Sequence, residues 1–233
     1  MSRSNSPLAL SVVTLTMPGD VAATFERITE FDDSDFGFNH NQTWAAMPKA
    51  LRGVFEPDSV SRSFSKTPKR VQKCITALCE IGKTTPLKTM GFLDFPESGL
   101  KTVEAIDWDP DVSVRVKATC WHVVADKARI LLLQPRKRAL EPLRLSAYVK
   151  LARRAYCQGD WINAGIDLID LSGDEEVVKG NFLDVENLPG ISDRELREFV
   201  ETFIEAKRLA DKERARRPKE ISYLPMAELL DID

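Results

Sequence analysis

The chain has 233 residues, of which 43% are hydrophobic and 30% are charged, and its net charge at pH 7 is −3. These fractions are typical of a globular protein that buries a core of its own, and they exclude a collagen-like, disordered or membrane-embedded chain. The slightly acidic balance excludes a field of the whole molecule that would attract nucleic acid, so any such binding needs a local basic patch.

Neither the N-terminus nor the cysteine pattern indicates export. No apolar run approaches the roughly 20 residues of a membrane-spanning helix, and residues 1–17 are too polar for the core of a secretory signal. Cys74, Cys79, Cys120 and Cys157 form no C-x-x-C pair, which disfavours a zinc ribbon, a redox motif or a disulfide scaffold. We therefore expect a cytoplasmic protein with reduced thiols and no contact with membranes.

The first segment of the chain has an extended pattern. Residues 8–17 alternate apolar and polar side chains, with a change of phase at Val12 and Val13 that predicts a bulge or a strand covered on both faces. Asp20 can then cap a helix over residues 21–31. The acidic, Asn-rich stretch that follows predicts a loop.

Two helices are expected next. Apolar residues recur at helical spacing around Pro48, a residue that should kink or restart the helix. Thr67 fits a cap before the preferred first-turn proline, and an apolar stripe then continues to Cys79. Gly82 can end this helix because glycine adopts the left-handed conformation at little cost.

The pattern then becomes extended. Residues 112–116 alternate apolar and polar side chains, as in a half-buried strand, and residues 128–134 are apolar on both faces. We expect these segments to form one antiparallel hairpin that turns at Asp126 and Lys127.

The last third returns to helices and strands. Its first elements are a helix over residues 145–156, a strand over 164–171 and a partner strand over 177–185. Ser192 and Glu195 fit a capping box at the start of a long final helix, which should run toward Arg217. The whole pattern predicts an α/β fold, with α+β as the alternative, in which a mixed sheet with a central antiparallel hairpin is flanked by helices.

We expect a single domain over residues 1–233. The alternative division has an acidic N-terminal part over 1–60, an α/β core over 61–217 and a docking segment over 218–233. The docking segment is apolar around Pro225, which favours either contact with a protein partner or packing on its own domain. The pattern does not indicate an oligomeric state.

One segment is strongly basic. Between Arg129 and Arg154 there are eight Lys and Arg residues and one acid, Glu141, which gives a local charge of +7. Nucleic acid is the leading ligand because phosphates bind such arrays by counterion release. An acidic protein surface, or a solvated face neutralised by the acids of residues 20–35, is the alternative. The predicted anion-binding residues are Arg136, Lys137, Arg138, Lys150, Arg153 and Arg154.

Three acids alternate in the sequence DWDPD: Asp107, Asp109 and Asp111. An EF-hand loop starting at Asp107 would need Gly at its sixth position and Glu at its twelfth, where this chain has Val112 and Ala118. That reading is excluded, whereas a magnesium site on Asp109 and Asp111 stays open.

Residues 67–171 are expected to form a helix, a strand hairpin, a second helix and a further strand, in that order. This order resembles the core of restriction-endonuclease-like nucleases, and the resemblance covers less than half of the chain. Members of that family place an acid on the second core strand and Glu/Gln-x-Lys on the third, to assemble Mg²⁺ and an attacking water. Here Gln134 is followed two positions later by Arg136, not Lys. The resemblance implies catalysis by Asp109, Asp111, Gln134 and Lys137 with Mg²⁺.

The expected hairpin register separates these residues. With a turn at Asp126 and Lys127, Asp111 would lie roughly 23 Å along the strand from Gln134. Phosphate-loop motifs are absent, and His40 and His122 have no catalytic partner at motif spacing. We therefore expect a non-catalytic binding or scaffolding component of an intracellular assembly, without a cofactor, that contacts a protein and, through its basic face, nucleic acid. The alternative is a divergent Mg²⁺-dependent nuclease whose acids come from residues 107–111, or are Asp167 and Asp170.

Overall fold

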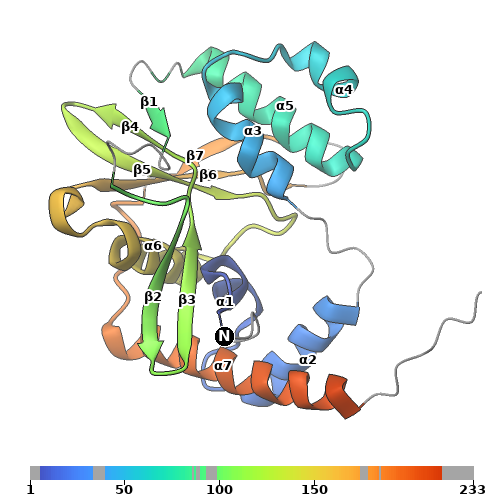
Figure 1. Cartoon of the computed structure of the whole chain (residues 1–233), viewed down its shortest axis with the longest axis vertical. Helices are drawn as coiled ribbons and strands as arrows, with labels where there is room; N and C mark the ends of the chain where they lie inside the picture. The colour runs from blue at the N-terminus through green and yellow to red at the C-terminus, as the bar shows by residue number, and fades with distance from the viewer. Residues whose placement is uncertain are drawn as a thin grey trace, which may run out of the picture.

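The computed structural model describes residues 6–33, 40–85, 87, 90–92, 99–173, 178–183 and 185–216. The fold is α/β: a five-stranded mixed sheet lies between two layers of helices, and a separate two-stranded ribbon projects from it (Figure 1). The strands are β1 (Met90–Phe92), β2 (Val103–Asp109), β3 (Val112–Lys117), β4 (Cys120–Val124), β5 (Lys127–Gln134), β6 (Gly165–Asp170) and β7 (Asn181–Leu183).

The sheet has the order β1-β4-β5-β6-β7, in which β5 and β6 are parallel and the other neighbours are antiparallel. The described helices are α1 (Ala9–Leu15), α2 (Val21–Asp33), α3 (Asn41–Leu51), η2 (Pro57–Ser59), α4 (Val60–Ser63), α5 (Lys69–Thr84), α6 (Pro142–Tyr156), η4 (Gly159–Trp161) and α7 (Asp193–Arg216). None of these helices combines the length and the apolar composition that a membrane crossing requires.

Two hydrophobic cores lie on the two faces of the sheet. Helices α3 and α5 cover one face, where Leu131 and Leu133 of β5 are fully buried. Helices α1, α6 and α7 pack on the other side, where Ile130 and Leu132 of the same strand are fully buried (Figure 1). Strand β5 is therefore central, which explains why its sequence is apolar on both faces.

The prediction of a strand over residues 8–17 is wrong, because Ala9–Leu15 form helix α1. Ala9, Val12 and Val13 share its buried face at the i, i+3, i+4 spacing of a helix. The change of phase at Val12 and Val13 was therefore the helical signal. Leu8, just before the helix, makes an isolated bridge to Arg115 of β3.

The single hairpin predicted over residues 112–134 is also wrong, because the segment contributes to two hairpins. Strand β3 pairs with β2 in the ribbon, and β4 pairs with β5 in the sheet. The turn between β4 and β5 is Ala125 and Asp126, both with positive φ (48° and 62°), as a tight hairpin turn requires. Strand β2 was not predicted.

Gly82 does not end helix α5, which continues to Thr84. Its role is close packing, because a Cβ at this position would lie 2.7 Å from the carbonyl oxygen of Ala50 in α3. The predicted cap is also wrong: the Thr67 hydroxyl donates to the carbonyl of Phe64, and no side chain caps α5. Pro48 lies inside α3.

The capping box predicted at the start of the C-terminal helix is confirmed. The N–H of Ser192 donates to Glu195 Oε2 at 2.8 Å, and the N–H of Glu195 donates to Ser192 Oγ at 3.1 Å. The predicted docking segment, residues 218–233, lies outside the described residues.

Candidate anion-binding site

The carboxyl ends of the parallel strands β5 and β6 form the floor of the site. Gln134 and Asp170 end these strands in register, and both are buried. The amide of Gln134 donates to the carbonyl of Arg138 at 2.8 Å, and its oxygen accepts the N–H of Arg136. These bonds hold the loop after β5 against the strand end, which is where ligands bind in open α/β sheets.

Arg70, in the first turn of α5, joins the two strand ends. Its guanidinium donates to the carbonyl oxygens of Leu171 at 2.6 Å and Gly173 at 3.1 Å. It also reaches the carbonyls of Pro135 and Arg136 at 3.4 Å, and only 6% of the residue is exposed. A buried positive charge therefore sits at this edge of the sheet.

Arg136 points inward from the loop after β5. Its Nη2 donates to Ser11 Oγ of α1 at 2.9 Å, and its Cζ lies 5.3 Å from the centre of the Phe31 ring in α2. Burial lowers the pKa of Arg136 to about 10. Among the residues that the structure describes, no carboxylate forms an ion pair with this guanidinium.

The start of helix α3 lies close to the positive charges of Arg70 and Arg136. Burial and the charges of Arg70 and Arg136 lower the pKa of His40, the residue before α3, to about 4. Its Nδ1 and the hydroxyl of Thr43 in the first turn are buried and have no hydrogen-bond partner in the described part of the chain. The first turn of α3 contains no acid and has no side-chain cap.

Two helix N-termini meet at this edge. A Cβ on Gly82, near the end of α5, would meet the carbonyls of Ala50 and Leu51 near the end of α3, and the two helices run side by side in the same direction (Figure 1). Their first turns therefore lie at the same end, and neither contains an acid. Both partial positive charges add to those of Arg70 and Arg136. We call Arg70, Arg136, His40 and the two first turns the strand-end cluster.

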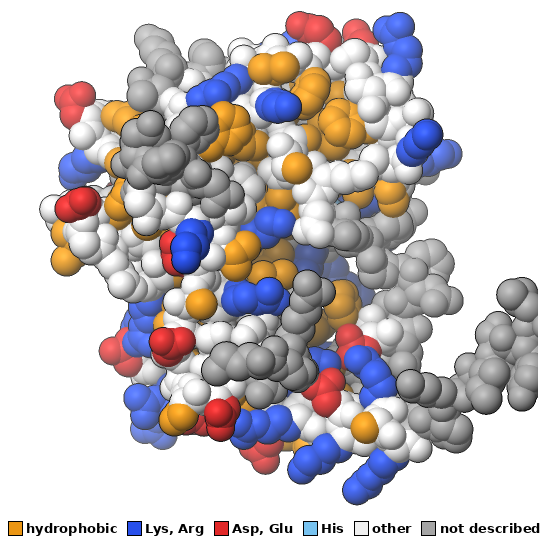
Figure 2. Space-filling view, viewed as in Figure 1, with side chains coloured by type: hydrophobic (Ala, Val, Ile, Leu, Met, Phe, Trp, Pro, Cys, Tyr) orange, Lys and Arg blue, Asp and Glu red, His pale blue; other side chains and the backbone are white. Residues whose placement is uncertain are grey.

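The six residues of the predicted basic face lie in different surroundings. Lys150 and Arg154 of α6 both pair with Asp193 at the start of α7, at 2.7 and 2.9 Å. Arg153 is exposed on the same helix, and Lys137 and Arg138 are exposed in the loop beside Arg136. Figure 2 shows Lys and Arg side chains spread over the viewed side of the molecule, in its middle as well as at its upper and lower ends.

The alternative catalytic residues lie on different parts of the fold. Asp109 and Asp111 are at the end of the β2–β3 ribbon, where Asp109 lines a groove between the ribbon and α7. Gln134 ends β5, in the main sheet, and its amide is bonded to the loop that contains Lys137. No group of three or more His, Cys, Asp or Glu side chains in the described residues could hold a metal ion.

A second polar cluster crosses the sheet at the other end of β5. Asp167 accepts from His122 Nε2 at 2.6 Å and from Arg129 at 2.7 Å, and Arg129 also pairs with Glu186. Burial alone would raise the pKa of Asp167, but the hydrogen bonds from His122 and Arg129 outweigh burial and hold it below its usual value. This cluster links β4, β5 and β6 and was not predicted.

Sequence reasoning also missed Arg70 and His40. An arginine in the first turn of an amphipathic helix resembles an ordinary solvated residue, and nothing local predicts four backbone acceptors. His40 had no partner at motif spacing because the residues near it are remote in the sequence. No protein-family model matches the chain, and no curated protein is significantly similar to it.

Proposed function

We propose that this chain is a non-catalytic binding protein that holds a phosphate group of its partner, most simply a nucleic acid, at the strand-end cluster. One observation carries the proposal: the guanidinium of Arg136 is half-buried and has no carboxylate partner among the described residues. A cation removed from water without a counter-charge is costly, and a bound anion would offset that cost.

The surroundings favour phosphate over other anions. A guanidinium fork and the N–H groups of helix first turns are the donors that phosphate oxygens accept in proteins. Here two first turns without acids lie beside Arg136, and exposed Lys137 and Arg138 follow it in the chain. Lys137 and Arg138 would contact neighbouring phosphates of a polyanion.

The experiment compares classes of anion. We would titrate the whole chain with fluorescent single-stranded DNA, double-stranded DNA, RNA and poly-glutamate at low and moderate salt. We expect nucleic acid to bind with an affinity that falls steeply as salt rises, because phosphate contacts release counterions. Failure of every nucleic acid to bind would overturn the proposal, and binding of poly-glutamate alone would indicate an acidic protein surface as the partner instead.

A further inference from the structure

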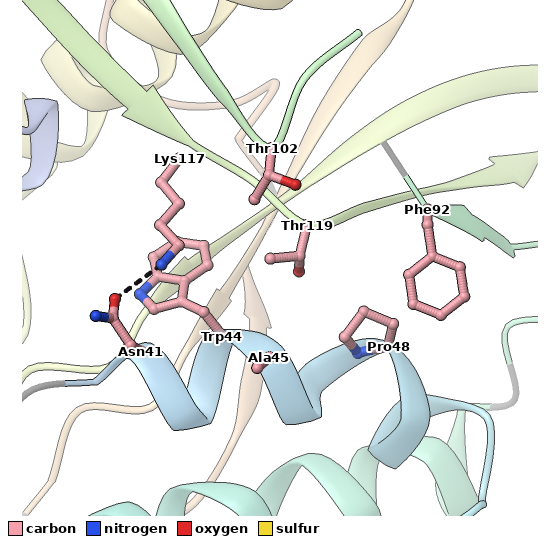
Figure 3. Close-up of a pocket in the computed structure, with 8 residues that line it drawn as sticks. All are labelled: Asn41, Trp44, Ala45, Pro48, Phe92, Thr102, Lys117 and Thr119. Atoms are coloured by element: carbon pink, nitrogen blue, oxygen red, sulfur yellow. Dashed lines mark hydrogen bonds between the residues drawn. The ribbon is translucent and has the colours of Figure 1, made fainter. Parts of the chain in front are cut away.

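A separate pocket lies between α3 and the segments that enter and leave the ribbon. Its volume is about 280 Å³, and Trp44, Pro48 and Phe92 form apolar walls (Figure 3). Trp44 and Pro48 project from successive turns of α3, and Phe92 closes the opposite end from β1. Drug-sized ligands usually need about 300 Å³ or more, so this pocket suits a ligand with a single ring.

One cation enters this apolar space. The ammonium of Lys117 donates to Asn41 Oδ1 at 2.9 Å and lies 5.5 Å from the centre of the Trp44 ring (Figure 3). Both neighbours are uncharged, and Lys117 forms no ion pair with an acid in the described part of the chain. Burial lowers the pKa of Lys117, because the charged form loses water without gaining an anion.

We propose that the pocket binds a small planar ligand that carries one carboxylate. The carboxylate would pair with the Lys117 ammonium, and the ring would lie between Pro48 and Phe92. Lys117 is the one Lys or Arg among the described residues that line the pocket, and Arg52 lies behind the Phe92 wall, 4.9 Å from the centre of its ring. One negative charge therefore matches the Lys117 ammonium, whereas a phosphate dianion would bring a surplus charge into an apolar space. The hydroxyl of Thr119, which also lines the pocket, supplies a further polar contact (Figure 3).

Two sources supply this chemistry: a free aromatic acid, and the C-terminal aromatic residue of a peptide. Benzoate represents the first and N-acetylphenylalanine the second, with benzamide as the neutral match to benzoate. We would titrate each into the isotope-labelled chain and follow the indole N–H signal of Trp44 by NMR, assigned with Trp44→Phe. We expect benzoate to bind with a Kd of about 1 mM or tighter, and benzamide at least tenfold more weakly.

The variants test the role of the cation. Lys117→Met keeps the apolar stem and should weaken benzoate at least tenfold, whereas Lys127→Met, on an exposed residue at the start of β5, should leave it unchanged. Tighter binding of N-acetylphenylalanine than of benzoate would identify a peptide end as the source. Equal binding of benzoate and benzamide, or no shift of the Trp44 signal up to the solubility limit, would overturn the proposal. Binding of benzoate in this pocket does not depend on the strand-end cluster, so the two proposals are tested independently.

Discussion

The guanidinium of Arg136 donates a hydrogen bond to the hydroxyl of Ser11 across 2.9 Å, and so joins the end of β5 to helix α1, 125 residues earlier in the chain. The same side chain lies over Phe31 of α2 and close enough to His40 to lower its pKa. The Arg136 side chain therefore contributes to the packing of the fold as well as to the proposed site. Any test of binding has to separate the two roles.

The junction between the ribbon and the sheet depends on the phenol of Tyr156. Its oxygen accepts the N–H of Ala118 at 3.0 Å and lies 2.9 and 3.0 Å from the carbonyls of Thr102 and Val116. Tyr156→Phe should reduce the free energy of unfolding by about 2 kcal/mol, because buried backbone groups lose their partner.

Tyr148→Phe is the matched control for this change. Tyr148 is equally buried in α6, but its hydroxyl makes no hydrogen bond within the described residues. Urea unfolding should show a change of less than about 0.5 kcal/mol for this variant. Equal losses in the two variants would mean that the junction does not depend on the Tyr156 hydroxyl.

The Asp167 cluster predicts a pH dependence of stability. The pKa of Asp167 is lower in the folded chain than in the unfolded one, so its contribution is complete above the unfolded value of about 3.9 and is lost as pH falls through the folded value. Asp167→Asn should cost about 2 kcal/mol at pH 7. Below pH 4 the difference from the wild type should shrink. Urea unfolding of both chains from pH 7 to pH 3 measures the difference in the free energy of unfolding. A difference that stays constant over this range would contradict the lowered pKa of Asp167.

Gly82 is expected to be intolerant of a side chain although it lies in a helix. Gly82→Ala gains helix propensity, but the new Cβ would meet the carbonyls of Ala50 and Leu51 at 2.7 and 2.8 Å. We expect a net loss of about 1–3 kcal/mol in the free energy of unfolding, as for other overpacked positions. Thr76→Ala in the same helix should be neutral or stabilising. A stabilised Gly82→Ala chain would show that α3 and α5 separate easily.

The acids of the ribbon should not support metal chemistry with Gln134. Asp109 and Asp111 lie at the ribbon end, and Gln134 is buried in the main sheet. In nucleic-acid cleavage assays with Mg²⁺ or Mn²⁺, we expect the Asp111→Asn and Gln134→Ala variants to give the same rate of cleavage as the wild type. A metal-dependent cleavage that disappears in both variants would instead support the nuclease alternative.

The sequence predicted those elements whose signal is local. The stripe of α5, the apolar run of β5 and the capping box of α7 each lie within a few consecutive turns or residues. Helix α1 was missed because seven residues give too short a pattern to separate a buried helix from a strand covered on both faces. The pairing of β3 with β2 was missed because β2, with its weaker alternation, was not recognised.

The candidate site was predicted only in part, and the reason is similar. The loop containing Arg136 was singled out by its charge, but charge does not reveal which arginines turn inward. Lys150 and Arg154 were grouped with it because of their spacing on α6, whereas Asp193 at the start of α7 pairs with both. Arg70 and His40 join the cluster from segments that only the packing of α3 and α5 brings close.

The most direct test compares two arginines of the predicted basic face in one binding assay. Arg136→Gln and Arg153→Gln each remove a single positive charge, but only Arg136 belongs to the strand-end cluster. Arg136→Lys keeps the charge and, with thermal unfolding of every variant, separates binding from folding. We predict that Arg136→Gln weakens nucleic-acid binding about tenfold or more, as loss of one charge-assisted contact does, and Arg153→Gln less than about twofold. Equal losses for the two variants, in chains that remain folded, would contradict a phosphate site at the strand ends.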